Sequence, residues 1–140
     1  MRVSGKVIFS RAYEYDRNLI IGTGKCDVSC FHFDPSIYYA EEKINIYRFE
    51  ELVSGELYFE WVTEIKKILS TKKICNLLEN TYSSYDVIAE VVDKKVDSLL
   101  IDTEGFSAIR LAPEKDIAGF NKGDYIQFKG NLSLDYMEKK

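Results

Sequence analysis

The stretch 20–27, Ile-Ile-Gly-Thr-Gly-Lys-Cys-Asp, contains the glycine and lysine combination found in phosphate-binding loops. Such a loop needs the spacing G-x-x-x-x-G-K-[ST] between a strand and a helix, so that backbone N–H groups meet the phosphates. Here Leu19 stands at the position of the first glycine, and Cys26 follows Lys25 where the motif has Ser or Thr. The next residues alternate like a strand. We therefore interpret the stretch as a hairpin turn and not as a nucleotide site.

Cys26, Cys30 and His32 form a C-x-x-x-C-x-H string that resembles a set of metal ligands. On a strand the two cysteines would share a face but lie roughly 13 Å apart, too far for one tetrahedral zinc ion or a disulfide. Cys30 and His32 alone could reach a common ion, but no third ligand is identifiable. We expect a buried cysteine, a hydrogen-bonded histidine, no metal and no cofactor. The odd count of three cysteines indicates reduced thiols.

The remaining catalytic candidates are carboxylates. His32 is the only histidine, and the chain has no G-x-S-x-G nucleophile elbow. Glu14 with Asp16, or Asp102 with Glu104, are formal candidates for acid–base work, but carboxylates at hairpin turns are usually solvated. We therefore predict that the chain is not an enzyme.

Three glutamates, Glu56, Glu60 and Glu64, recur at a spacing of four residues. They share one face of either a strand or a helix, and on a strand the opposite face, with Trp61, should supply the core. Acidic, tyrosine-rich surfaces suit a basic partner, because charge steers the encounter and the rings anchor it. A solvated face is the alternative. The predicted partner-binding residues are Glu56, Tyr58, Glu60, Glu64, Tyr39 and Tyr47.

An internal repeat organises the chain. Residues 19–31 align without a gap on residues 99–111, and the only two prolines, Pro35 and Pro113, fall at equivalent places. Further matches join 43–49 to 122–128 and 55–61 to 130–136. Such self-similarity predicts a duplicated unit.

Each copy reads as three short strands, a connection after the proline and a closing two-strand hairpin. The connection has a possible helical turn at 36–42 or 114–121, and the hairpin joins 44–49 to 56–61 or 124–130 to 131–136. Between the copies, apolar residues approximate helical spacing and predict a helix over 65–80. The predicted fold is mainly β, with two tandem five-stranded units and one connecting α-helix. The predicted boundaries are 1–65 for the first unit, 66–84 for the connecting helix and linker, and 85–140 for the second unit.

The second unit resembles the oligonucleotide/oligosaccharide-binding (OB) fold in the segments "VIAEVV", "SLLIDTEG", "FSAIRL" and "NKGDYIQFKGNLSLD". By the repeat, the resemblance extends more loosely over residues 3–65. It implies a small β-barrel that binds single-stranded nucleic acid through stacking aromatic rings and nearby cations. The first unit is rich in rings interleaved with Arg and Lys, but the net charge of −4 counts against this function.

A small, acidic, aromatic-rich and non-catalytic chain is also similar in type to bacterial immunity proteins, which cover the basic active site of a nuclease toxin. That resemblance implies a basic protein partner. No apolar run approaches the roughly 18 residues that span a bilayer, and the first residues lack a secretory signal, so we expect no membrane partner and a cytoplasmic location. Two functions stay open: a protein-binding module, which the charge favours, and a single-stranded nucleic-acid binder.

Overall fold

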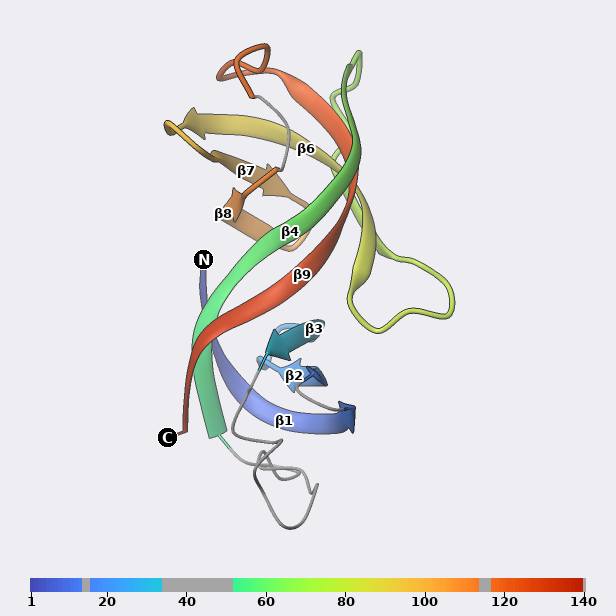
Figure 1. The fold of residues 1–140 in the computed structure, drawn as a ribbon, viewed down its shortest axis with the longest axis vertical. Coiled ribbons are helices and arrows are strands. Elements are labelled where there is room, and N and C mark those ends of the chain that lie inside the picture. Colours follow the sequence, from blue (N-terminus) through green and yellow to red (C-terminus); the bar gives the residue numbers. More distant parts are fainter. Residues whose placement is uncertain (14–15, 34–51, 114–116, 140) are drawn as a thin grey trace. The chain divides into compact units, whose positions relative to one another are not determined.

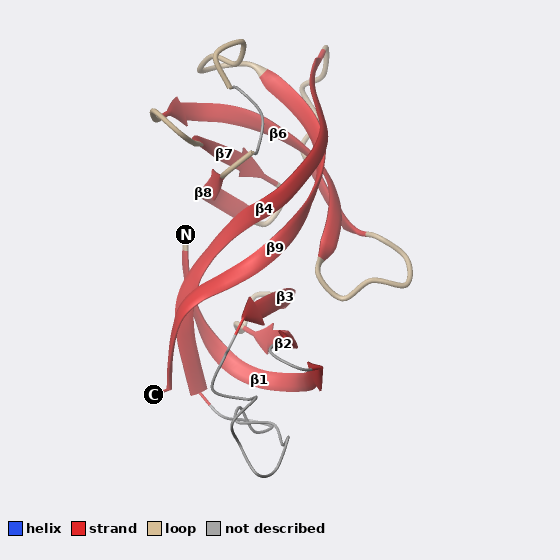
Figure 2. Ribbon diagram, in the orientation of Figure 1, coloured by secondary structure: helices blue, strands red, loops and turns tan. Residues whose placement is uncertain are grey.

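A computed structural model describes residues 1–13, 16–33, 52–113 and 117–139. These residues form nine strands and no helix (Figures 1 and 2), so the prediction of a mainly β chain is confirmed. The strands are hydrogen-bonded in the order β1-β2-β3-β9-β4-β8-β7-β6-β5, with further pairings of β1 with β4 and of β9 with β6. Their bounds are β1 (Arg2–Tyr13), β2 (Asp16–Gly22), β3 (Asp27–Phe33), β4 (Leu52–Ile68), β5 (Ile74–Leu77), β6 (Ser84–Lys94), β7 (Leu99–Thr103), β8 (Phe106–Leu111) and β9 (Tyr125–Lys139).

Contacts divide the chain into two compact units. The central unit comprises residues 58–132 with Met1, and the terminal unit comprises residues 2–57 and 133–140. The two long strands take part in both units, because β4 passes from the terminal to the central unit after Leu57 and β9 passes back after Leu132.

In the terminal unit, β1, β2 and β3 form an antiparallel meander. The start of β1 also pairs antiparallel with the start of β4, and β3 pairs in parallel with the second half of β9 at Phe31 and Ser133. The β2–β3 turn has Gly24 at φ 89° and is closed by the Thr23 N–H, which donates to the Cys26 carbonyl at 3.0 Å. The stretch 20–27 is therefore a hairpin, as predicted.

The central unit repeats this pairing pattern. Strands β6, β7 and β8 form an antiparallel meander, β6 pairs antiparallel with the start of β9, and β8 pairs in parallel with β4 at Tyr58 and Phe59. The β7–β8 turn carries Gly105 at φ 83°. Residues 99–111 thus form a hairpin, like their predicted counterpart 19–31.

Phe59 lies at the centre of the core of the central unit. Its ring makes edge contacts with the rings of Tyr85, Phe106 and Phe128, at centroid distances of 6.3, 6.4 and 5.3 Å. Such pairs contribute about 0.5–1.5 kcal/mol each beyond the burial of their area. The alternation of buried and less buried residues along β6, and along β9 as far as Gly130, is the period of two expected when one face of a strand packs on a core.

The helix predicted over residues 65–80 is wrong. Its first residues belong to β4, and Ile74–Leu77 is strand β5, which pairs antiparallel with β6 from Ile74 and Ile88 to Leu77 and Tyr85. The apolar spacing that suggested a helix is interrupted by the polar residues 70–73, and Leu69 is fully exposed. A helix here would have no continuous apolar stripe to bury, whereas β6 offers backbone hydrogen-bond partners.

The closing hairpin predicted for the second copy is also wrong, because β9 runs through it as one strand. Gly130, at the expected turn, is buried and pairs with Tyr85, and a Cβ there would meet the Phe128 ring at 3.2 Å. Gly130 therefore allows close packing within a strand, and it does not form the predicted turn. In the first copy, the helical turn predicted near residues 36–42 and the first hairpin strand near 44–49 lie outside the described residues.

Candidate functional site

Strand β4 contains two residues in a left-handed backbone conformation, Trp61 at φ 49° and Glu64 at φ 55°. This conformation is uncommon for residues other than glycine and costs roughly 1–2 kcal/mol per residue. It shifts the alternation of buried and exposed side chains along the strand by one position. The buried residue that follows Phe59 is therefore Val62, and Trp61 is 57% exposed. The expectation that Trp61 supplies the core is therefore wrong, and the indole is presented at the surface of the central unit.

Tyr58 and Glu60 lie together on β4. The Tyr58 hydroxyl donates a hydrogen bond to Glu60 Oε2 at 3.1 Å. The guanidinium of Arg110, which is the register neighbour of Tyr58 on β8, lies 4.7 Å from the centroid of the tyrosine ring. This cation–π contact, worth about 0.5–1 kcal/mol at an exposed site, holds the ring in place.

The other two glutamates form ion pairs. Glu64 Oε2 lies 3.2 Å from Lys129 Nζ, and Glu56 Oε1 lies 3.7 Å from Arg2 Nη1. Glu56 belongs to the terminal unit, whereas Glu60 and Glu64 belong to the central unit. Of the predicted partner-binding residues, the structure thus brings Tyr58 and Glu60 into contact and places Glu64 on the same strand segment. Tyr39 and Tyr47 lie outside the described residues.

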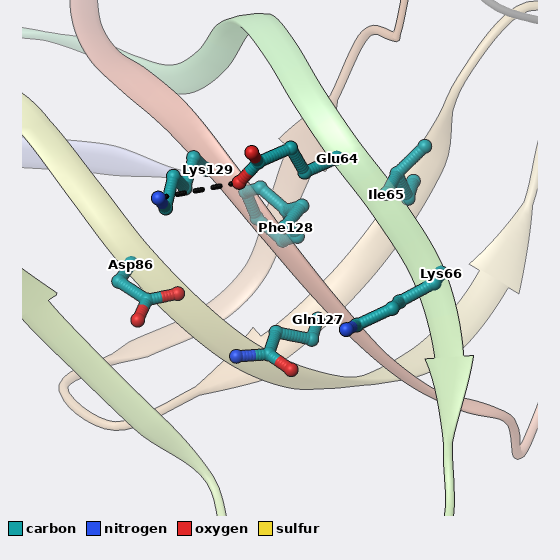
Figure 3. A pocket seen from close by; sticks show the side chains of 7 residues that line it. All are labelled: Glu64, Ile65, Lys66, Asp86, Gln127, Phe128 and Lys129. Carbon is teal, nitrogen blue, oxygen red and sulfur yellow. Dashed lines mark ion pairs between the residues drawn. The ribbon is translucent and has the colours of Figure 1, made fainter.

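A surface pocket of about 590 Å³ opens beside Glu64 in the central unit (Figure 3). Its walls come from β4, β6 and β9. Asp86 and Lys129 are directly opposite each other in the β6–β9 register, so their side chains share one face of the sheet. Phe128, which alternates to the other face, is fully buried beneath them. The lining residues are Glu64, Ile65, Lys66, Asp86, Gln127, Phe128 and Lys129.

Three polar side chains in this pocket have no partner among the described residues: the Asp86 carboxylate, the Gln127 amide and the Lys66 ammonium. Lys129, the residue opposite Asp86, extends to Glu64 instead, as the dashed line in Figure 3 shows. The pocket therefore holds hydrogen-bonding capacity that the described part of the chain does not use.

The sequence interpretation missed Asp86, Gln127 and Lys129. Their alternation with buried neighbours in "SYDVIAE" and "YIQFKG" places them on the outward face of two strands, which is a readable signal. The register that sets Asp86 opposite Lys129 joins segments about forty residues apart, and no local pattern contains it.

The cysteine and histidine side chains that were considered as metal ligands do not form a common site. Cys30 is fully buried, and this burial raises the pKa of its thiol to about 12. His32 hydrogen-bonds through Nδ1 to the Leu134 carbonyl at 2.8 Å, while Cys26 is exposed. Within residues 1–13, 16–33, 52–113 and 117–139, no three His, Cys, Asp or Glu side chains are grouped in a way that would hold a metal ion.

Within the same ranges no helix has the length and hydropathy needed to cross a membrane. Comparison of the chain with protein families, with curated proteins and with solved structures found no match.

Proposed function

We propose that this chain is a non-catalytic protein-binding module whose partner presents a basic surface. The observation that carries the proposal is Trp61, a large aromatic side chain more than half exposed on a left-handed backbone. Tryptophan is strongly enriched among the residues that dominate binding energy at protein interfaces. Backbone strain clusters at functional sites, because a fold keeps such a conformation only where the surroundings enforce it.

Charge supports a basic partner. Glu60 and Glu64 flank Trp61 on β4, and the whole chain carries a net charge of −4. Complementary charge raises association rates, and the ion pair of Glu64 with Lys129 leaves the glutamate side chain 67% exposed. A nuclease toxin, whose active site must bind phosphates, is the partner class that fits an acidic, immunity-type protein.

Affinity capture tests the proposal. The parent chain and the Trp61→Ala variant are immobilised, and proteins bound from an extract of the source cells are identified and then measured in purified form. We expect one basic protein whose affinity falls at least tenfold with Trp61→Ala, because interface anchors contribute 2 kcal/mol or more. Val96→Ala, which removes a fully exposed apolar side chain from a loop of the same unit, is the matched control.

Association kinetics test the role of charge. Glu60→Gln with Glu64→Gln should slow association with that purified partner, most strongly at low salt, because screening removes the effect of charge at high salt. Equal affinity of the parent and the Trp61→Ala variant for every captured protein would refute the proposal.

Single-stranded nucleic-acid binding is the second candidate, and the strand pairing favours it. In each unit an antiparallel meander has its first strand paired antiparallel with a fourth strand and its third strand paired in parallel with a fifth. We propose that both units are OB-like on this basis, which is an analogy of fold alone. A gel shift with a single-stranded oligonucleotide tests it: tight binding that weakens steeply with salt would favour this function over the first.

A further inference from the structure

We infer that the pocket of Figure 3 accepts an arginine side chain of the basic partner, with Asp86 and Gln127 as the acceptors of its N–H groups. This inference rests on the proposed function and specifies the chemistry by which the partner is recognised. The pocket includes Glu64, so it adjoins the β4 segment that carries Trp61.

The acceptors come from neighbouring strands. Asp86 on β6 is opposite Lys129, and Gln127 is two residues before Lys129 on β9, so both acceptors project from one face of the sheet. Lys129 is engaged by Glu64 at 3.2 Å, which leaves the Asp86 carboxylate without a cationic partner among the described residues. A guanidinium has five N–H donors in a planar fork and can reach a carboxylate and an amide oxygen together.

The rest of the pocket suits the aliphatic part of an arginine. Ile65 lines the wall, and Phe128 of β9 also borders the pocket. Arginine buries its methylene stem against apolar surface while the charged head finds polar partners. A volume of about 590 Å³ lies within the roughly 300–1,000 Å³ of small-ligand pockets, so one long side chain fits inside it.

The positive charge of Lys66 distinguishes a pocket that binds a cation from one that binds an anion. In Figure 3 its side chain extends toward Gln127, so its ammonium lies on the side of the pocket where the guanidinium would bind. Two cations repel each other, and a neutral residue at position 66 should therefore strengthen arginine binding. If the pocket bound an anion instead, a neutral residue at position 66 would weaken binding.

The test uses the full-length chain labelled with ¹⁵N and the peptide acetyl-Gly-Arg-Gly-amide as the probe. We expect chemical-shift changes at the backbone amides of Asp86 and Lys129 and at the Gln127 side-chain NH₂. Asp86→Asn should weaken peptide binding about tenfold, because the guanidinium loses its charged acceptor and keeps only a neutral one. Lys66→Gln should strengthen binding. Asp97→Asn, which changes an exposed carboxylate in the β6–β7 loop, is the control and should have no effect.

The same peptide with citrulline in place of arginine keeps the shape and removes the charge. Equal shifts with the citrulline peptide, shifts confined to other strands, or an Asp86→Asn variant that binds as well as the parent would overturn the inference. These outcomes are separable from a failure of the proposed function, because that function is judged by the Trp61-dependent capture of a protein and not by peptide binding.

Discussion

The imidazole Nδ1 of His32 lies 2.8 Å from the carbonyl oxygen of Leu134, which is 102 residues further along the chain. A carbonyl oxygen only accepts, so Nδ1 must carry the hydrogen. The bond lies beside the parallel pairing of Phe31 with Ser133 and fastens the last part of β9 to β3 in the terminal unit.

Replacing His32 should therefore loosen the terminal unit. We expect His32→Ala to lower the free energy of unfolding by about 1–2 kcal/mol, because it removes the partly buried hydrogen bond to Leu134. Urea denaturation measures the loss. Lys25→Ala, at the exposed β2–β3 turn, is the control and should change stability by less than about 0.5 kcal/mol. Equal effects of the two substitutions would contradict a structural role for the imidazole.

Gly55 in β4 provides a test of packing in the terminal unit. A Cβ at this position would lie 2.8 Å from Leu134 Cδ1 and 2.9 Å from the Asp135 carbonyl oxygen, and the second contact is with backbone that cannot swing away. Gly55→Ala should therefore destabilise the protein by about 1–3 kcal/mol, the usual range for overpacking. Gly119→Ala adds the same methyl group where no atom lies within 4 Å, and its thermal unfolding should match that of the parent. If both variants melt together, the close contact at Gly55 does not exist in solution.

Ala108 on β8 is a position where substitution by glycine should stabilise the fold, whereas glycine within a strand usually destabilises it. Its φ of 48° is strained for alanine but free for glycine, and its side chain is exposed. Ala108→Gly should raise the free energy of unfolding by up to about 1 kcal/mol, because relief of the left-handed strain exceeds the added entropy of the unfolded chain. The buried Ala89 on β6 is the control, and Ala89→Gly should destabilise. A similar loss in both variants would mean that residue 108 is not left-handed.

Two thiols should make the fold sensitive to alkali. Burial raises the pKa of Cys75 from 9.0 to about 12, with a smaller contribution from the Glu104 carboxylate, and burial raises that of Cys30 to the same value. Well below pH 9 both thiols are protonated in the folded and unfolded chains, so they do not change the free energy of unfolding with pH. Above pH 9 only the unfolded chain releases these protons, and the free energy of unfolding should fall by about 1.4 kcal/mol per pH unit for each thiol.

Urea titrations at pH 8, 9.5 and 10.5 measure this slope. Cys75→Ala should unfold with a shallower dependence on pH than the parent, because one of the two thiols is gone. Cys26 is exposed and should be the first of the three thiols to react with iodoacetamide. An identical pH dependence in the parent and in Cys75→Ala would show that the thiol of Cys75 is not shielded from water.

The sequence by itself determined the features that depend on neighbouring residues. Alternating apolar residues predicted strands, and the glycines near positions 24 and 105 predicted the turns of two hairpins, because side-chain period and turn geometry are local properties. The outward position of Asp86 and Gln127 was equally readable from alternation with their buried neighbours.

Tertiary structure decided the rest. Residues 74–77 form a strand because β6 offers hydrogen-bond partners, and β9 continues through Gly130 because its pairing with β6 continues at Tyr85 and Ser84. Trp61 faces outward because a left-handed residue shifts the alternation of β4, and backbone strain of this kind leaves no mark in an apolar pattern. The pairing register sets Asp86 opposite Lys129 and so brings both to the pocket. Register between distant strands depends on the packing of the whole core, which no short stretch of sequence contains.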